Sequence, residues 1–160
     1  MNIMHPIILA ISLGTATIIG AATPAAAQHH HTVVPAEEVK WGPAPPSLPP
    51  GAQAAALLGS PAKEGPFVLR LKFPAGFKVP PHRHSKDEFV TVISGGFAVA
   101  AGEKLNPETK ALPAGSFIHL PAGMPHFAMA VGETVVQING MGPFDVTYVD
   151  PKDDPRKKTN

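Results

Sequence analysis

The sequence predicts an all-β protein, and two observations carry this prediction. The chain of 160 residues contains 15 glycines and 20 prolines, about twice the share of these residues in average globular proteins. Long helices are excluded, because proline removes a backbone donor and glycine loses more conformational entropy on folding. The second observation is a series of short apolar runs, each ended by glycine or proline, which is typical of a β-sandwich or barrel.

The composition also excludes several kinds of function. The chain has no cysteine, so it has no disulfide framework, thiolate metal site or cysteine nucleophile. Its 44% hydrophobic residues and formal net charge of +1 are those of a folded chain, and they give no support to nucleic-acid binding. Neither Gly-x-Ser-x-Gly nor Gly-x-Gly-x-x-Gly occurs, so neither a nucleophile elbow nor a dinucleotide loop is indicated.

Residues 1–27 are predicted to be a secretory signal peptide. Positions 7–22 are uncharged and mostly apolar, and an Ala-x-Ala sequence follows that ends at Ala27. This pattern indicates cleavage after Ala27, although no Lys or Arg precedes the apolar run. An uncleaved membrane anchor is the alternative, but the run is shorter than the ~20 residues of a spanning helix. We expect a periplasmic or secreted protein that is free of the membrane after cleavage.

The mature chain is expected to begin with a proline-rich arm over residues 28–59. The histidines at 29–31 can contact a metal, but a solvated terminus is the expected role of this end. Residues 35–50 contain six prolines and are therefore expected to be extended. Trp41 is expected to pin the arm to the body of the protein by burying its ring, and residues 54–58 are predicted to form a short helical turn.

Residues 60–150 are expected to form the β-barrel, and residues 151–160 a charged, flexible tail. In the first strand, Phe and Leu alternate with Val, Arg and Lys in the period of two of a half-buried strand. The predicted strands are residues 67–73, 88–93, 97–101, 117–120, 126–131, 134–139 and 144–149. Residues 103–110 are predicted to be a polar loop. The turns are predicted at Gly95-Gly96, Pro113-Ala114-Gly115, Pro121-Ala122-Gly123 and Gly132-Glu133.

The strongest functional candidates are histidines, of which the chain has eight. His82 and His84 stand two positions apart in an extended, proline-led segment, so both side chains project to one face. Glu88 opens the next strand after a short bend, which lets its carboxylate return to the two imidazoles. His126 opens another strand and can supply a third imidazole. Imidazoles combined with one carboxylate suit a divalent first-row metal.

The spacing of these residues resembles the two sequence motifs of the cupin superfamily. The first motif is matched without a gap by Gly76, His82, His84, Glu88 and Gly95. The second is matched by Gly115, Pro121, Gly123 and His126, but its final Asn is replaced by Ala130. The resemblance covers residues 76–130 directly, and the flanking strands fit the same barrel. The segment before about residue 60 is not covered.

The resemblance implies a cupin-type jelly-roll β-barrel with one metal ion inside and assembly into a homodimer. Carried over from the family, the ligands are His82, His84, Glu88 and His126. The ion would be Fe, Mn, Ni, Cu or Zn, and an octahedral ion would keep two positions open. Some cupins lose these ligands and use the barrel only as a scaffold, but here all four are present. Ala130 removes an amide from the inward face and leaves the ligands intact.

Five further residues are weaker candidates for the site. His119 is the remaining barrel histidine. If its strand face points inward, it is a catalytic base or a substrate contact, and otherwise it is a partly buried histidine. Arg70 and Gln137 can enter the cavity from their strands. Ala128 and Ala130 are expected to give the substrate pocket apolar walls.

Three functions are compatible with this site. The first is a metal-dependent oxidoreductase, of the dioxygenase type, acting on a small organic molecule. The second is an isomerase or decarboxylase that uses the ion as a Lewis acid. The third is a non-catalytic cupin of the cell envelope that binds or senses a metal or a metabolite. Oxygen uptake that depends on a substrate distinguishes the first function, whereas Zn(II) alone in the purified protein favours the third.

Overall fold

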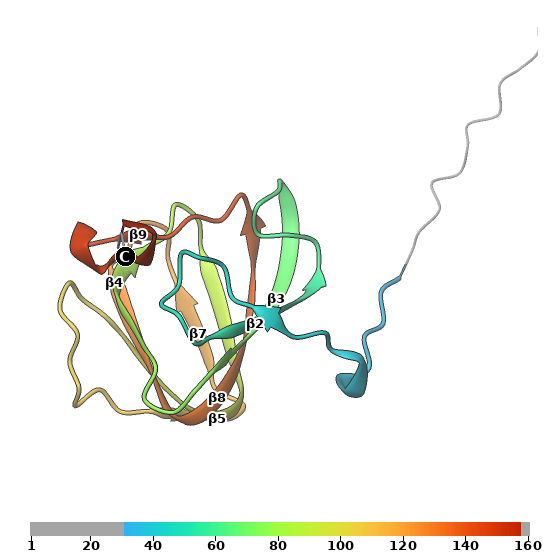
Figure 1. The fold of residues 1–160 in the computed structure, drawn as a ribbon, viewed down its shortest axis with the longest axis horizontal. Coiled ribbons are helices and arrows are strands. Elements are labelled where there is room, and N and C mark those ends of the chain that lie inside the picture. Colours follow the sequence, from blue (N-terminus) through green and yellow to red (C-terminus); the bar gives the residue numbers. More distant parts are fainter. Residues whose placement is uncertain (1–30, 158–160) are drawn as a thin grey trace, which may run out of the picture. The chain divides into compact units, whose positions relative to one another are not determined.

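The protein is all-β over residues 31–157, which are the residues that the computed structural model describes (Figure 1). This confirms the predicted fold class. The signal peptide prediction, together with His29 and His30, lies outside the described residues. Within the described range, the helices are three short 3-10 turns. None of the helices there has the length and apolar character needed to cross a membrane.

Nine strands pair antiparallel in one continuous sheet. They are β1 (Gly42–Pro43), β2 (Gln53–Leu58), β3 (Gly65–Phe73), β4 (Lys78–Arg83), β5 (Glu88–Ala101), β6 (Leu112–Pro113), β7 (Phe117–Leu120), β8 (His126–Gly142) and β9 (Thr147–Tyr148). The 3-10 turns are η1 (Ala36–Glu38), η2 (Pro151–Asp153) and η3 (Pro155–Lys157). The order is β1-β2-β3-β8-β4-β9, while β5 pairs with β6, β7 and β8. Strand β8 is therefore central, with β3 and β4 on one edge and β5 on the other.

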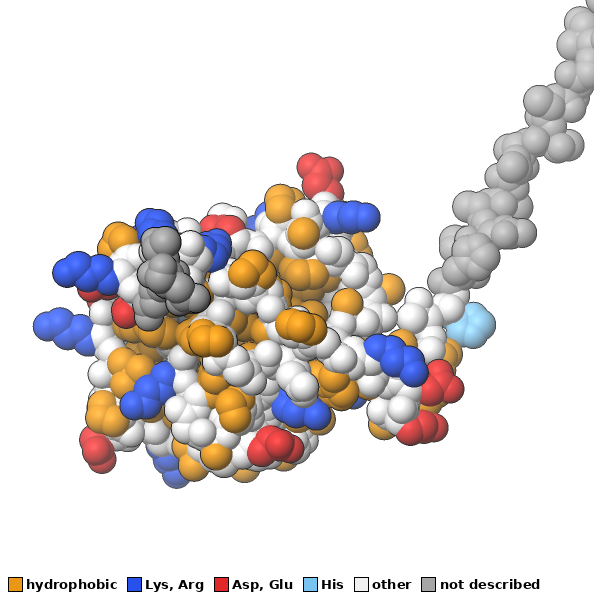
Figure 2. Space-filling view, in the orientation of Figure 1, with side chains coloured by type: hydrophobic (Ala, Val, Ile, Leu, Met, Phe, Trp, Pro, Cys, Tyr) orange, Lys and Arg blue, Asp and Glu red, His pale blue; other side chains and the backbone are white. Residues whose placement is uncertain are grey.

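The core lies between the inward faces of these strands. In β3, the four residues Phe67, Leu69, Leu71 and Phe73 are buried and alternate with more exposed neighbours, as the period-two pattern predicted. They pack with inward residues of the paired strands, among them Val90, Val92, Val136 and Ile138. Figure 2 shows hydrophobic side chains near the centre of one face, with charged side chains of both signs distributed around it.

The turns predicted at Gly95-Gly96 and Gly132-Glu133 are wrong, because β5 and β8 each continue through these positions. Gly95 and Gly132 have positive φ values, +78° and +76°, and the pairing register shifts on both sides of Ser94. Such irregularities bend a strand without reversing the chain. The two strands therefore form one long ribbon that bends in its middle.

Thr134 joins the two bends. Its side chain is fully buried, and its hydroxyl donates a hydrogen bond to the Gly96 carbonyl at 3.0 Å and accepts one from the Gly96 amide at 3.3 Å. A Cβ on Gly95 would lie 2.3 Å from the carbonyl oxygen of Glu133, so only glycine fits where the strands approach so closely.

The segment before β3 differs from its prediction in two respects. Residues 36–38, predicted to be extended, form the 3-10 turn η1. Residues 54–58 lie in β2, so the predicted helical turn is wrong. Ala55 is 2% exposed, and the strand pairs with β3. Pairing and burial on the barrel thus outweigh the helix propensity of an Ala-Leu run. Trp41 contacts β3 through Lys72, whose Nζ lies 4.5 Å from the centre of the indole ring. At the other end, the strand predicted at 144–149 is shorter and comprises only Thr147 and Tyr148.

Candidate metal centre

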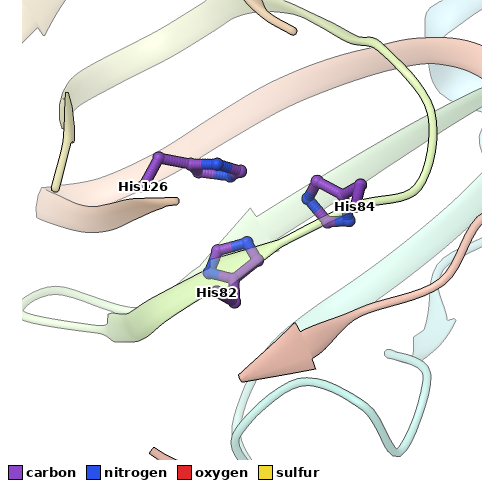
Figure 3. A group of neighbouring side chains, drawn as sticks. All are labelled: His82, His84 and His126. Carbon is purple, nitrogen blue, oxygen red and sulfur yellow. The ribbon is translucent and has the colours of Figure 1, made fainter. Parts of the chain in front are cut away.

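Three buried imidazoles converge at one end of the barrel (Figure 3). His82 lies in β4, His84 follows that strand, and His126 is the first residue of β8. Strand pairing brings them together, because His82 is the register partner of His126. One ring nitrogen from each histidine lies within 4.8 Å of the other two. This distance allows a single ion to contact all three.

The backbone fixes which nitrogen of each ring is free. Each Nδ1 contacts a backbone carbonyl at 2.5 to 3.0 Å, which belongs to Pro80 for His82, Asp145 for His84 and Met124 for His126. A carbonyl oxygen can only accept, so Nδ1 carries the proton and the lone pair is on Nε2. The Nε2 of His84 is buried without a hydrogen-bond partner. A metal ion would satisfy this atom, so the three histidines are suited to act as ligands of such an ion.

Glu88, the first residue of β5, lies beside two of the three histidines. Its Oε2 lies 3.4 Å from the Nε2 atoms of both His84 and His126, and the side chain is buried. Burial alone would raise its pKa, but the adjacent imidazoles of His126 and His84 lower the pKa of Glu88 to about 2. The carboxylate is therefore ionised, as a ligand of a divalent cation must be.

The imidazoles themselves have different protonation properties. Burial, reinforced by the neighbouring His126 and His84, lowers the pKa of His82 to about 3. This imidazole is neutral and its lone pair is free for a metal. Burial acts in the same direction on His84, but the adjacent Glu88 carboxylate raises the pKa of that imidazole above its ordinary value. Without a metal, a proton on Nε2 of His84 would be shared with the Glu88 carboxylate.

The four side chains lie in the wall of a cavity of about 230 Å³. The remaining wall is almost entirely apolar and includes Leu71, Val90, Leu120 and Ile138. Residues of the N-terminal arm line it as well, namely Pro45, Ser47 and Leu48. Among the described residues that line the cavity, only Ser47 carries a polar side chain outside the histidine and glutamate cluster. The cavity thus combines a polar end with hydrocarbon walls.

Three residues that sequence reasoning did not single out support the cluster. The ring of Phe144 stacks on that of His84, with centroids 4.3 Å apart and planes inclined by 23°. The carboxylate of Asp145, whose carbonyl contacts His84, accepts hydrogen bonds from the amide, at 2.8 Å, and the hydroxyl of Ser85. Tyr148 is the register partner of His82 and donates its hydroxyl to the Ser47 carbonyl at 2.7 Å. No spacing signal links these residues to the histidines.

The structure brings His82, His84, Glu88 and His126 together, and it places Ala128 in the cavity wall. Ala130 is buried in the core cluster and is not among the cavity-lining residues.

The other three candidates lie outside the cavity. Arg70 alternates with the inward-facing Leu69 and Leu71, and its Nε donates to Oε1 of Gln137 at 3.2 Å. His119 is exposed, where its Nε2 lies 3.1 Å from Oδ2 of Asp87.

Several solved structures share this fold, and one of them is described as an RmlC-like cupin. Three of them are a candidate acetylacetone dioxygenase from Methylibium petroleiphilum PM1, the polyketide cyclase RemF from Streptomyces resistomycificus and an RmlC-like cupin from Shewanella frigidimarina NCIMB 400. The first has a TM-score of 0.62 at 21% identity, and the match covers 81% of this chain and 88% of that one. The second has a TM-score of 0.61 at 18% identity, covering 79% and 90%. The third has a TM-score of 0.54 at 17% identity, covering 71% and 92%.

The chain belongs to the family described as a domain of unknown function, DUF4437, whose model matches residues 32–158. No curated protein matches it in sequence.

Proposed function

We propose that the protein binds one divalent transition-metal ion and acts as a dioxygenase-type oxidoreductase on a small organic molecule. One observation carries this proposal: the Nε2 atoms of three buried histidines and the carboxylate of Glu88 converge at the wall of an apolar cavity. The candidate acetylacetone dioxygenase of the same fold supports the choice of reaction.

The residues present would hold the ion as three neutral nitrogens and one carboxylate oxygen, a set that suits Fe, Mn, Ni, Cu or Zn. When bound, such an ion supplies Lewis acidity and, if it is redox-active, a path for electrons between a substrate and dioxygen. The chain itself orients the imidazoles through their Nδ1–carbonyl contacts and surrounds the substrate with hydrocarbon that excludes water.

The cavity favours this reaction over an isomerase that moves protons between two side chains. Among the described residues in its wall, the titratable groups are the three imidazoles and Glu88. If all four of these groups hold an ion, no titratable side chain of the described wall is left to act as an acid or base towards a bound substrate. A reaction in which the ion carries the electronic change needs no acid or base in the wall.

Elemental analysis of purified protein tests the ligand set. We expect one divalent ion per chain in the wild type and none in the His82→Ala/His84→Ala double variant. His119→Ala is the matched control, because this imidazole is exposed and outside the cavity. Unchanged metal content in the double variant would sink the assignment.

Oxygen uptake tests the reaction. Metal-loaded wild type is expected to consume dioxygen with a member of a panel of small diketones, phenols or thiols. Stoichiometric metal without uptake for any of these compounds would favour the non-catalytic, metal- or metabolite-binding alternative.

A further inference from the structure

The residues that line the cavity restrict which ligands can bind beside the proposed metal ion. We propose that it selects a small O,O-chelating molecule with a single negative charge and an otherwise hydrocarbon body, such as an enolisable 1,3-dicarbonyl compound. This inference rests on the proposed metal site, and it concerns what would bind beside the ion.

The walls offer no partner for a second charge on the ligand. Among the described lining residues there is no lysine and no arginine. Arg70 and Arg83 lie on wall-forming strands, but neither lines the cavity. A carboxylate or phosphate group away from the metal would therefore be buried without a counter-charge or a donor, which is strongly unfavourable.

The charge balance at the proposed metal ion also favours a chelating ligand with a single negative charge. A divalent ion held by neutral imidazoles and the Glu88 carboxylate leaves one net positive charge. A monoanionic chelate neutralises this charge, whereas a dianionic chelate leaves an uncompensated negative charge among apolar side chains. The hydrocarbon walls, formed by residues such as Leu69, Val136 and Phe97, then suit the rest of the molecule.

The volume limits the size of the ligand. The cavity measures about 230 Å³, whereas an engineered apolar cavity of about 150 Å³ holds a benzene molecule. A single ring or short chain with small substituents therefore fits. Polyhydroxylated molecules would find few hydrogen-bond partners in the cavity, since Ser47 has the only hydroxyl among the described lining residues.

Acetylacetone and malonate form a matched pair of probes. Both chelate through two oxygens in a six-membered ring, but the first binds as a monoanion with two methyl groups and the second as a dianion. The protein is loaded with Co(II), and its metal content is measured first. Each probe is then titrated by calorimetry and by the visible Co(II) spectrum, and the same titrations are made on Co(II) in buffer.

We expect the protein to favour acetylacetone over malonate by at least about tenfold more than Co(II) in buffer does, because burial penalises the second charge. A preference equal to that in buffer, or reversed, overturns this inference and leaves the metal centre standing. A wild-type protein that binds no Co(II) overturns both the inference and the proposed function.

A charge introduced into the wall gives an independent measurement. Leu48 lines the cavity and is half-buried, so Leu48→Lys places an ammonium group at the wall. We expect this variant to shift the selectivity towards malonate by about fivefold or more. Leu58→Lys is the control, because Leu58 is 44% exposed and does not line the cavity. Equal selectivity in the two variants, both carrying stoichiometric Co(II), would contradict the proposal.

Discussion

The phenyl ring of Phe144 stacks on the imidazole of His84, with 4.3 Å between ring centroids. The next residue, Asp145, accepts the Nδ1 proton of the same imidazole through its carbonyl. The short segment after β8 thus fixes both the ring plane and the tautomer of His84, a candidate metal ligand that lies about 60 residues earlier in the chain. This contact leads to the first prediction.

Phe144→Ala is expected to weaken metal binding by about tenfold, because the stacked phenyl ring holds the His84 imidazole in the orientation that binds the metal. The affinity is measured by competition with a chromophoric chelator. Phe117→Ala removes a phenylalanine that is 65% exposed and does not line the cavity, so its metal affinity should equal that of the wild type. Equal affinities in all three proteins would show that the ring does not position His84.

Removal of the ion is expected to lower the melting temperature. An ion that binds only the folded state at 100 times its Kd stabilises by about 2.7 kcal/mol, which corresponds to at least about 5 °C for a domain of this size. The measurement is calorimetry with and without EDTA. The His82→Ala/His84→Ala variant supplies the baseline, since its melting temperature should not respond to the chelator. A wild type that is equally insensitive would mean that the ion does not stabilise the fold.

Gly95→Ala is expected to destabilise the protein more than Gly76→Ala. Both glycines have positive φ, +78° and +74°, so both variants incur a backbone penalty of about 1 kcal/mol. At Gly95 the new methyl group would also meet the Glu133 carbonyl oxygen at 2.3 Å, whereas nothing lies within 4 Å at Gly76. We expect an additional loss of about 2 kcal/mol at Gly95, measured by denaturant unfolding. Similar values for both variants would argue against close packing at the bend.

Tyr148→Phe removes the hydroxyl that holds the arm at the Ser47 carbonyl. A hydrogen bond of this kind contributes about 1 kcal/mol, so local opening of the arm should become about fivefold more frequent. Hydrogen exchange of the Leu48 amide, which donates to the Pro45 carbonyl, reports this opening. The Ala44 amide, bonded to Ala52, is the internal control. Unchanged exchange at Leu48 would show that the hydroxyl does not restrain the arm.

Local spacing predicted the first two histidines of the cluster. His82 and His84 project together because residues two apart share a strand face, and the proline-led approach keeps them extended. That Glu88 and His126 join them was implied by the resemblance to the cupin motifs, because His126 lies on a different strand, far from His84 in the sequence. The structure brings the four side chains together.

The sequence did not show which face of each strand points into the cavity. An alternating pattern shows that a strand has two faces, but only the pairing decides where a polar residue on it points. Arg70 and Gln137 accordingly meet each other outside the cavity. The glycines at 95 and 132 were ambiguous for a related reason, since a positive φ serves a bulge as well as a turn. The helical turn expected at 54–58 was overridden by pairing with β3.

The bend joined by Thr134 also decides when the metal site becomes complete. His126 pairs with Ala101 near one end of the β5–β8 ribbon, and Phe89, next to Glu88, pairs with Asn139 near the other. In a straight ribbon the two ends would be about 40 Å apart, yet Oε2 of Glu88 and Nε2 of His126 are separated by 3.4 Å. A chain that has not yet folded over can offer imidazoles, but it cannot add the carboxylate. Binding of an ion by all four side chains would therefore require the folded barrel.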